Sequence, residues 1–296
     1  MKKILILKDN YNSFEQYYSK RLNEVCDACE FYYRSSSNLR KIMTHYGVVG
    51  ESLYYGKWKN KIHTYDIIIV FDSLHTCNLL RYIHRRTDAR LIYWHWNPIK
   101  TNKEKKIIYD TEMWCEHWTF NPVDAEKYGM KLNNQFFFFQ DENTIEKENS
   151  AFFVGTDKGR YAQLMLLASI LEKSNIIPDF HIIDREHEGR FLEKKYMDYD
   201  EVLRHLVSTK AVVEIVQDNQ TGLTARALEA MFFNTKLITN NREIKACSFY
   251  KKENIYIIGE DKDGLEIFLS TQFESIEKKE LYPYSAEGWI KSFDVI

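Results

Sequence analysis

Residues 211–241, AVVEIVQDNQTGLTARALEAMFFNTKLITNN, decide the fold of this chain. The run AVVEIV at 211–216, apolar except for Glu214, predicts a strand that is buried on both faces, because a half-exposed strand would alternate apolar and polar residues. A polar loop follows it, and a helix is then expected over 222–233 and a second short strand over 235–239. This alternation indicates a parallel sheet with helices on both faces.

The same alternation runs through the rest of the 296 residues. In the first half it predicts strands at 3–7, 29–33, 66–71, 91–96 and 117–121, and helices at 13–26, 36–46, 76–87 and 102–114. In the second half the further elements are strands at 150–155, 179–184 and 255–259, and helices at 158–174 and 199–208.

We therefore predict an α/β protein of two doubly wound, Rossmann-like domains that face a cleft. The first domain is expected over 1–140, a polar linker over 141–150 and the second domain over 151–280, followed by a C-terminal helix over 281–296 that can pack back on the first domain. In such sheets ligands bind beyond the carboxyl ends of the strands, so the loops that follow strands should carry the chemistry.

The composition, 44% hydrophobic and 28% charged, is typical of a soluble globular protein. No apolar run approaches the roughly 18 residues that a membrane-spanning helix needs. The N-terminal stretch MKKILILKDN has too short an apolar run for a signal peptide and is interpreted as a strand. Five scattered cysteines argue against a disulfide framework, and the C-x-x-C pair Cys26 and Cys29 is interpreted as two ordinary thiols near a helix end. We expect a cytoplasmic protein.

The charge is uneven along the chain. Residues 1–140 carry 21 Lys and Arg against 15 Asp and Glu, a charge of +6, and the remainder carries 20 against 28, a charge of −8. A basic first half can face an anionic partner, although solvated surface lysines explain it equally well. Nucleic acid is not expected as a partner, because the chain has no basic arm and no nucleic-acid-binding motif.

One polar turn of the second domain has the composition of a phosphate site. In FFVGTDKGRYAQ a buried strand ends at Gly155, and Lys158 and Arg160 then precede a helix. Free amides at a helix start and two basic side chains suit a phosphate or diphosphate, while a Gly-containing turn with surface charges is the alternative interpretation.

The other polar loop is the one in the opening stretch, where Thr221 or Gly222 is expected to start the helix. Glu229 lies about two turns further on among apolar neighbours, so its carboxylate needs a partner. One interpretation is an internal pair with Arg226 at i, i+3. The other is a carboxylate that accepts two ribose hydroxyls.

These two segments resemble the donor-binding region of GT-B glycosyltransferases, in which a stretch of the form E-G-x-G-x-x-x-x-E-A-M precedes a small strand. Glu229 and the two residues after it match the end of that stretch, and Gly222 matches its first glycine, whereas Thr221 and Thr224 stand at the leading glutamate and the second glycine. VGTDKGRY resembles the family segment whose basic residues meet the donor diphosphate. WTFNPVDAEKYGMKLNNQFFFF at 118–139 is similar to segments of bacterial polysaccharide glycosyltransferases.

The resemblance implies a metal-independent hexosyltransferase of surface polysaccharide synthesis, with a nucleotide diphosphate sugar as donor and a glycan or lipid-linked molecule as acceptor. It implies no cofactor, a donor site in the second domain, acceptor binding in the first, and peripheral contact with the inner face of the cell membrane; retention and inversion both stay open. The donor-binding residues that we expect are Gly155, Lys158, Arg160, Gln220, Thr221, Gly222, Thr224, Arg226 and Glu229.

In the first domain, polar residues follow three strands whose carboxyl ends should converge. An inverting transfer needs a base to take the proton of the acceptor hydroxyl. The candidates are Asp9, Asp72, His75 and His95, each of which can instead be a turn-capping or hydrogen-bonded polar group, with His95 packed between tryptophans.

No metal site is expected. Asp198 and Asp200 have D-x-D spacing, but they open a helix and are interpreted as its N-terminal cap. A non-catalytic protein that binds a nucleotide or sugar and a sugar-nucleotide epimerase are the alternatives to a transferase.

Overall fold

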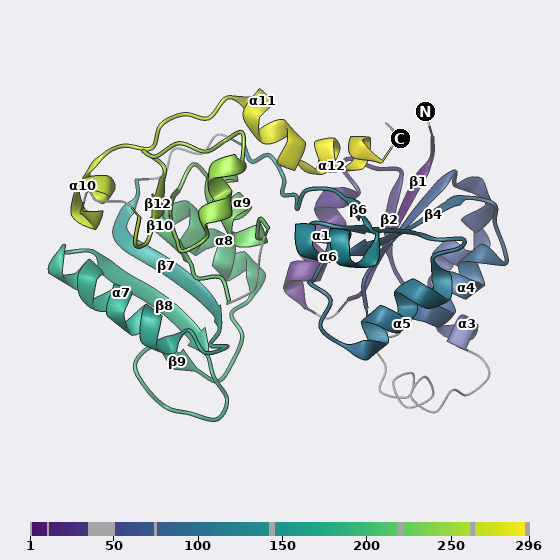
Figure 1. Cartoon of the computed structure of the whole chain (residues 1–296), viewed down its shortest axis with the longest axis horizontal. Helices are drawn as coiled ribbons and strands as arrows, with labels where there is room; N and C mark the ends of the chain where they lie inside the picture. Colours follow the sequence, from purple (N-terminus) through teal and green to yellow (C-terminus); the bar gives the residue numbers. More distant parts are fainter. Residues whose placement is uncertain are drawn as a thin grey trace. The chain divides into compact units, whose positions relative to one another are not determined.

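The computed structural model describes residues 2–10, 12–34, 51–73, 76–141, 146–217, 222–260 and 264–293. The chain divides into two compact units, one made of Met1–Asn134 with Ile290–Ile296 and the other of Gln135–Trp289. Within the described residues each unit is built on a six-stranded parallel sheet, as the alternation of apolar runs predicts (Figure 1).

The first unit has the strand order β2-β1-β3-β4-β5-β6. Its strands are β1 (Ile4–Lys8), β2 (Ala28–Phe31), β3 (Ile67–Phe71), β4 (Arg90–His95), β5 (Glu116–Thr119) and β6 (Lys131–Leu132). Its α-helices are α1 (Ser13–Leu22), α3 (Glu51–Tyr54), α4 (Thr76–His84), α5 (Asn102–Thr111) and α6 (Pro122–Tyr128). The central strands β1 and β3 are buried along their whole length, so the apolar composition of β3 and of Ile4–Leu7 in β1 follows from cover on both faces.

The second unit has the strand order β12-β11-β10-β7-β8-β9. Its strands are β7 (Glu148–Thr156), β8 (Ile177–Ile183), β9 (Leu192–Glu193), β10 (Thr209–Glu214), β11 (Lys236–Thr239) and β12 (Ile255–Ile257). Its α-helices are α7 (Tyr161–Lys173), α8 (Tyr199–Ser208), α9 (Ala225–Phe232), α10 (Leu265–Ser270) and α11 (Lys278–Leu281), and α12 (Ala286–Ser292) continues into the first unit.

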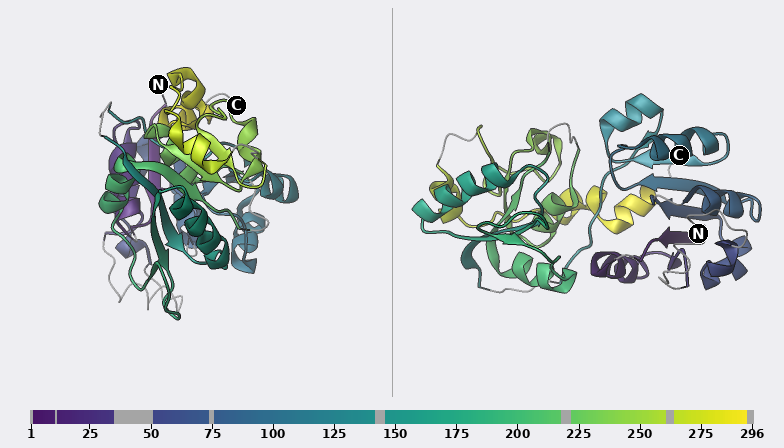
Figure 2. Two further views of the ribbon diagram at one scale, coloured as in Figure 1. Left: turned by 90° about the vertical axis from the view of Figure 1, so that its left-hand side faces the viewer. Right: turned by 90° about the horizontal axis from the view of Figure 1, so that it is seen from below.

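Helices cover both faces of the second sheet (Figures 1 and 2). Apolar residues of α7 and α10 pack with Phe153 and Phe180 in the core of one face. On the other face, the ring of His205 in α8 stacks on Phe152. This two-sided cover leaves the carboxyl ends of the strands as the place for polar loops.

Every expected strand is present, with each end within two residues of the prediction. The two-residue strands β6 and β9 were not predicted, because they are too short to leave a pattern. The expected helix 36–46 lies outside the described residues. Strand β7 begins at Glu148, within the residues expected as a linker, and pairs there with Thr209. The two compact units divide after Asn134.

The predicted starts of two helices were wrong for a backbone reason. Lys158 and Gly159 have φ values of +48° and +81°, and Gly222 has a φ of +90°. Left-handed residues cannot belong to a right-handed first turn. Helix α7 therefore starts at Tyr161, and α9 starts at Ala225, with Thr224 as its cap.

The expected C-terminal helix is broken into two. Helix α11 ends at Leu281, a short 3-10 turn with Pro283 follows, and α12 begins at Ala286. Beyond it the chain belongs to the first unit, where the ring of Phe293 packs on that of Trp118 with centroids 4.9 Å apart.

Gly288 tests the packing of α12 against the 3-10 turn Tyr282–Tyr284. A Cβ at Gly288 would lie 2.0 Å from the carbonyl oxygen of Tyr282, which is backbone that cannot turn away. We expect Gly288→Ala to lower the free energy of unfolding by about 2 kcal/mol in urea titrations. Gly264→Ala is the control for added bulk, because its Cβ meets nothing within 4 Å and its φ is −58°. As Gly264 is the N-cap of α10, where Ala is less favourable than Gly, it should cost no more than about 1 kcal/mol. Equal effects of the two substitutions would contradict the packing.

Candidate functional site

The carboxyl edge of the first sheet gathers polar side chains from three loops. Asp9 follows β1, Asp72 and Ser73 follow β3, and Asn97 follows β4. The Ser73 hydroxyl donates to Asp9 Oδ2 at 3.2 Å, and the backbone N–H of Asn97 donates to Asp72 Oδ2 at 3.2 Å. Two of the four proposed bases are thus in one place, whereas His75 lies outside the described residues.

Asp72 has the pKa of a general base. Burial raises its pKa to about 7, and the backbone N–H groups of Asn97 and Trp96 counteract only part of that rise. A carboxyl group with a pKa close to neutral is ionised in part at pH 7, which is the state in which proton transfer is most effective.

His95 is a buried histidine, which agrees with the alternative interpretation that it is packed between tryptophans. It is only 1% exposed, and its Nε2 lies 3.0 Å from Nδ1 of His117. The His117 Nε2 is in turn 2.9 Å from the hydroxyl of Thr111. Burial lowers the pKa of His117 to about 4 and that of His95 well below its usual range. The candidate base His95 is therefore corrected to an interior group, because it has no exposed face for an acceptor.

Lys8 was missed by the sequence analysis, because a lysine at the end of a strand is usually exposed. It is 1% exposed and its Nζ lies 2.7 Å from Glu15 Oε2. The same ammonium group lies 4.0 Å from the ring centroid of Phe71 and 5.4 Å from that of Trp96. Phe71 and Trp96 lie 63 and 88 residues from Lys8 in the sequence, so no local pattern reports these contacts.

The turn after β7 is held by Arg160. Its Nε donates to the carbonyl of Asp157 at 3.0 Å, its Nη1 to that of Ile215 at 2.7 Å and its Nη2 to that of Thr156. Burial lowers the pKa of the guanidinium. A Cβ on Gly155 would approach Arg160 Nη2 to 3.3 Å, so the glycine leaves room for this side chain. Arg160 therefore ties the carboxyl end of β7 to the segment that follows β10.

Glu229 is held inside the second unit by one hydrogen bond and one ion pair. Its Oε1 accepts a hydrogen bond from the Tyr199 hydroxyl at 2.6 Å, and its Oε2 lies 2.5 Å from Nη1 of Arg226. Burial raises the pKa of Glu229, and Arg226 counteracts the rise. The structure thus shows the internal i, i+3 pair, one of the two interpretations of this residue.

Glu214, at the end of β10, is a second buried carboxylate of this edge, and the sequence analysis did not single it out. Its oxygens accept hydrogen bonds from the hydroxyls of Thr224 and Thr239, and burial raises its pKa. The Thr224 hydroxyl also accepts from the N–H of Ala227 as the cap of α9. Gly222 is held by its carbonyl, which accepts from Asn241 at 3.1 Å. The candidate donor residues Gln220 and Thr221 lie outside the described residues.

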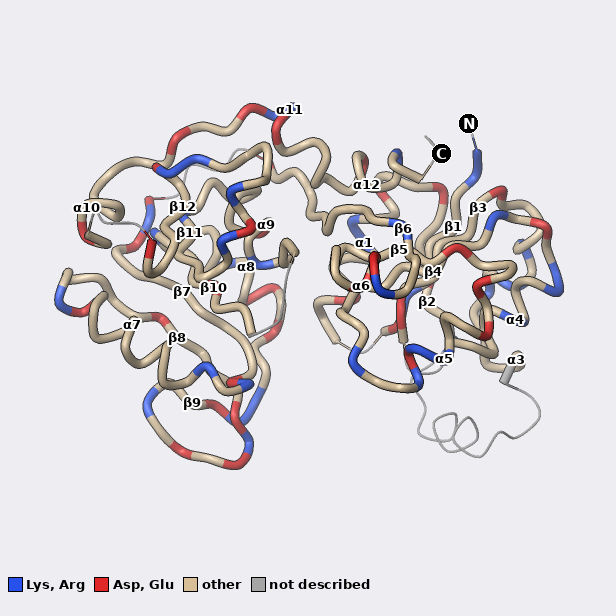
Figure 3. Tube along the Cα trace, viewed as in Figure 1, with Lys and Arg blue, Asp and Glu red and all other residues tan. Residues whose placement is uncertain are grey.

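The carboxyl edge of the second sheet thus combines two arginines, Arg160 and Arg226, with two buried glutamates. The left-handed turn at Lys158 and Gly159 adds a third cation at the end of β7. Figure 3 shows that acidic and basic positions are interspersed along both units. Cations held beside buried carboxylates suit an anionic ligand that carries hydroxyl groups.

Three smaller expectations have outcomes. Asp198 caps α8 and accepts from the N–H of Asp200, so the D-x-D pair is a cap as predicted. Burial raises the pKa of Cys26 to about 12 and that of Cys29 to about 11, as expected for unreactive thiols. Within the described parts of the chain, no helix combines the length and apolarity that crossing a bilayer requires.

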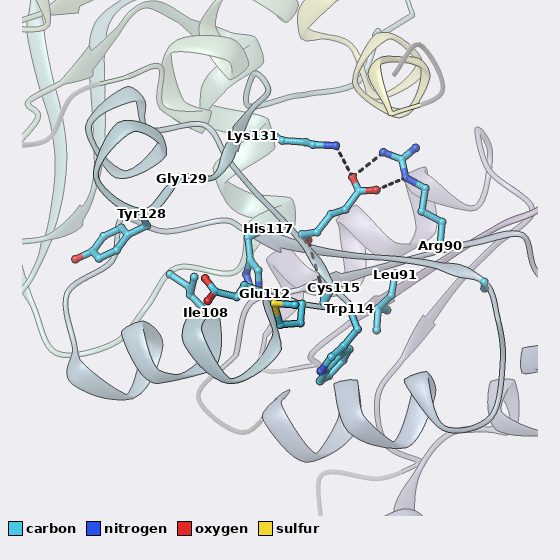
Figure 4. A pocket seen from close by; sticks show the side chains of 13 residues that line it. Arg90, Leu91, Ile108, Glu112, Trp114, Cys115, His117, Tyr128, Gly129 and Lys131 are labelled. Atoms are coloured by element: carbon cyan, nitrogen blue, oxygen red, sulfur yellow. Dashed lines mark hydrogen bonds and ion pairs between the residues drawn. The ribbon is translucent and has the colours of Figure 1, made fainter.

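A pocket of about 460 Å³ opens at the amino ends of β4 and β5, on the sheet edge away from Asp72 (Figure 4). Glu116 at its rim is paired with Arg90 through contacts of 2.6 and 2.7 Å and with Lys131 at 3.1 Å. These hydrogen bonds outweigh burial and lower the pKa of Glu116 to about 2. The pocket therefore has a satisfied ionic rim and holds none of the predicted site residues.

Comparison with solved structures places the architecture. Sucrose-phosphate synthase from Thermosynechococcus elongatus aligns with a TM-score of 0.56 at 9% identity, over 100% of this chain and 98% of that one. A DNA-modifying β-glucosyltransferase aligns with a TM-score of 0.52 at 13% identity, over 100% and 99%. TarM aligns with a TM-score of 0.50 at 14% identity over 77% of this chain, which spans only 54% of TarM.

The chain has the GT-B fold. No family model matches the sequence, and no characterised protein matches it by sequence. The solved structures therefore establish the architecture of this GT-B chain, and its chemistry has to be argued from its own residues.

The Arg226–Glu229 pair generates a prediction. We expect Arg226→Ala to lower the free energy of unfolding by about 3 kcal/mol at pH 8, because it leaves a buried carboxylate without its cation. The loss should shrink at pH 5, since burial already raises the pKa of Glu229 and the unpaired group then takes up a proton in the folded state.

Arg242→Ala is the control for that substitution, because Arg242 pairs with Glu260 at a site where its side chain is 67% exposed. Urea titrations should place it within about 0.5 kcal/mol of the parent. A loss for Arg226→Ala that is the same at both pH values would mean that Glu229 is not the group left unpaired.

Proposed function

We propose that this protein is a glycosyltransferase that moves a hexose from a nucleotide diphosphate sugar to a glycan or lipid-linked acceptor in surface polysaccharide synthesis. The observation that carries the proposal is the group of cations at the carboxyl edge of the second sheet, in a chain with the GT-B fold. No metal ion takes part in the proposed transfer, and the protein acts in the cytoplasm, with peripheral contact at the inner face of the membrane.

On the donor side, Lys158 and Arg160 bind the diphosphate. Three N–H groups of Arg160 are directed at carbonyl oxygens, which fixes the plane of the guanidinium, and its two others can donate to phosphate oxygens. The close backbone approach at Gly222 gives room for the nucleotide. Fixed cations stabilise the charge that develops on the leaving diphosphate, without reorganisation during the reaction.

Glu229 binds the ribose by an exchange of partners. In the structure its carboxylate is held by Tyr199 and Arg226, so the ribose hydroxyls take the position of Arg226. Arg226 is then released toward the diphosphate, one helical turn nearer the start of α9. The ribose hydroxyls thus donate hydrogen bonds to the buried carboxylate in place of Arg226, so Glu229 is not left without a partner.

On the acceptor side, Asp72 is the base. Its carboxylate takes the proton of the acceptor hydroxyl as the C–O bond to the sugar forms and the bond to the diphosphate breaks. Asp9 lies beside it and accepts from Ser73, so it orients the loop after β3.

A thermal-shift panel of UDP-, GDP-, dTDP- and CMP-sugars tests the donor assignment. We expect at least one of the diphosphate sugars to raise the Tm and, with a suitable acceptor, to be consumed with release of the nucleoside diphosphate. A shift without turnover would support the non-catalytic alternative, and no shift with any of them would overturn the proposal.

Lys158 provides the residue-level test of diphosphate binding. Lys158→Ala should weaken the nucleoside diphosphate about tenfold in calorimetric titrations and leave the corresponding nucleoside unchanged, because the ammonium meets only the phosphates. Lys173→Ala, in the last turn of α7, the helix that follows Lys158, is the control and should alter neither. Equal weakening of diphosphate and nucleoside by Lys158→Ala would contradict the role.

Asp72→Asn should lower turnover about 100-fold or more, and turnover of the parent should rise with pH through about 7, where Asp72 loses its proton. The same substitution should increase the stability of the fold, although it lowers turnover. Because the folded-state pKa is raised, ionised Asp72 costs stability above pH 7, so Asp72→Asn should raise the Tm at pH 8.

Asp66→Asn, at the other end of β3, is the control for that substitution, since its carboxylate only accepts from the N–H of Lys3. It should leave the pH profile of turnover unchanged. A profile that persists in Asp72→Asn would assign the base to another group.

A further inference from the structure

Four side chains from three successive elements meet on one face of the second sheet. Asp179 and His181 lie on β8, Glu193 on β9 and His205 on α8. The Nε2 of His181 lies 3.0 Å from Asp179 Oδ1, and the Nδ1 of His205 lies 2.6 Å from Asp179 Oδ2. The Nδ1 of His181 is 2.6 Å from Glu193 Oε1.

The sheet places this cluster away from the donor edge. Phe152 is the register partner of Asp179, and Val154 that of His181, so these residues share the sheet face that α8 covers. The ring of His205 is stacked on Phe152, with centroids 4.7 Å apart and planes 10° apart, which fixes its orientation. The three side chains Asp179, His181 and His205 are 21% to 28% exposed, so an ion can reach them from solvent.

The contacts of His181 require either a second proton on its ring or a metal cation beside it. Both of its ring nitrogens face carboxylate oxygens, one of Glu193 and one of Asp179. A neutral imidazole has one N–H and one lone pair, so it can donate to only one of them. If Nδ1 donates to Glu193, the lone pair on Nε2 points at Asp179 unless a proton or a metal cation lies between them.

The ligand atoms have the spacing of a metal site. One atom each from Asp179, His181 and His205 lie within 4.8 Å of one another. A tetrahedral Zn²⁺ with bonds of about 2.1 Å needs ligand atoms about 3.4 Å apart. The closest pair of ligand atoms in the cluster is 2.6 Å apart and none is more than 4.8 Å apart, so the required spacing lies within this range. Movements of less than about an ångström at each side chain are therefore enough to bring the ligand atoms to this spacing.

We propose that Asp179, His181 and His205 bind a divalent transition-metal ion of the Zn²⁺ class, with Glu193 as the group that orients His181. A carboxylate on the far ring nitrogen of a ligating histidine fixes its tautomer and raises its basicity. Nitrogen and carboxylate ligands together favour Zn²⁺ over the purely oxygen-ligated Mg²⁺ and Ca²⁺. This departs from the sequence-based expectation of no metal site, which rested on residues that are close together in the sequence.

The ion would fasten α8 to the sheet. His205 lies in the last turn of α8, and Tyr199 at the first residue of the same helix donates to Glu229. A metal bond at one end of α8 thus steadies the hydroxyl that holds the carboxylate of the donor edge. The site is structural, because it lies apart from the cations that are proposed to meet the donor.

Titration of the full chain with ZnCl₂ after treatment with a chelator tests the proposal. We expect one tight site, and a rise in Tm on the order of 5 °C at 100-fold excess of Zn²⁺ over its Kd. His205→Gln and Asp179→Asn should each weaken this site about 100-fold, and Glu193→Gln about tenfold. Protons should be released on binding, which the dependence of the binding enthalpy on buffer measures.

His187→Gln is the matched control, because His187 also pairs with one aspartate, Asp184 at 2.8 Å, but on an exposed loop without a second histidine. It should bind Zn²⁺ as the parent does. The spectrum of the Co²⁺ form of the parent is independent of any variant and should show a tetrahedral visible band without a thiolate charge-transfer band.

Two results would overturn the proposal. One is a Zn²⁺ affinity that is the same in the parent, His205→Gln and Asp179→Asn. The other is a Co²⁺ spectrum of the parent that is octahedral or dominated by thiolate, which would place the ion in water or on the cysteines. Donor binding is measured separately by the nucleotide-sugar titrations, so failure of this site leaves the transferase proposal untouched.

Discussion

The burial of Glu214 is the constraint on which the ligand-binding edge of the second unit depends. Its carboxylate closes β10 at 4% exposure and is satisfied by two hydroxyls, of Thr224 and Thr239. Thr224 is also the cap of α9, so the last residue of a strand sets where that helix begins. The helix then carries Glu229 to the hydroxyl of Tyr199, and a second buried carboxylate is compensated in turn.

In the first unit, the carboxylate of Asp72 is compensated less completely than Glu214 and Glu229 are in the second. Asp72 receives hydrogen bonds from the backbone N–H groups of Asn97 and Trp96 and from the Asn97 side chain, but these offset only part of the effect of burial, and its pKa stays at about 7. A partly compensated acid costs stability where it is ionised, and such a cost is common at sites that need a reactive group. The buried ammonium of Lys8 in the same unit is compensated by Glu15 and by aromatic faces.

The sheets could be predicted because a strand buried on both faces is mainly apolar, and ten short runs of this composition can be recognised in the sequence without knowledge of their partner strands. Backbone conformation set the limit: the left-handed Lys158 and Gly222 shift two helix starts by three residues, and nothing in a hydrophobic pattern reports that. For His95 and Glu229 both interpretations were available, but the choice depended on His117 and Tyr199, which lie 22 and 30 residues away. The group around Asp179 was invisible for the same reason, since only the pairing of β8 with β9 brings Glu193 to His181.

The return of the chain to the first unit has a consequence for its biosynthesis. The first sheet is finished at Leu132, but Phe293, whose ring packs on Trp118 and whose carbonyl accepts from Arg90, is made more than 150 residues later. The whole second unit therefore emerges from the ribosome while one part of the first core is still unfilled. The domain that begins first is completed last, and a nascent chain stalled in the second unit would expose the indole of Trp118 to solvent and to chaperones.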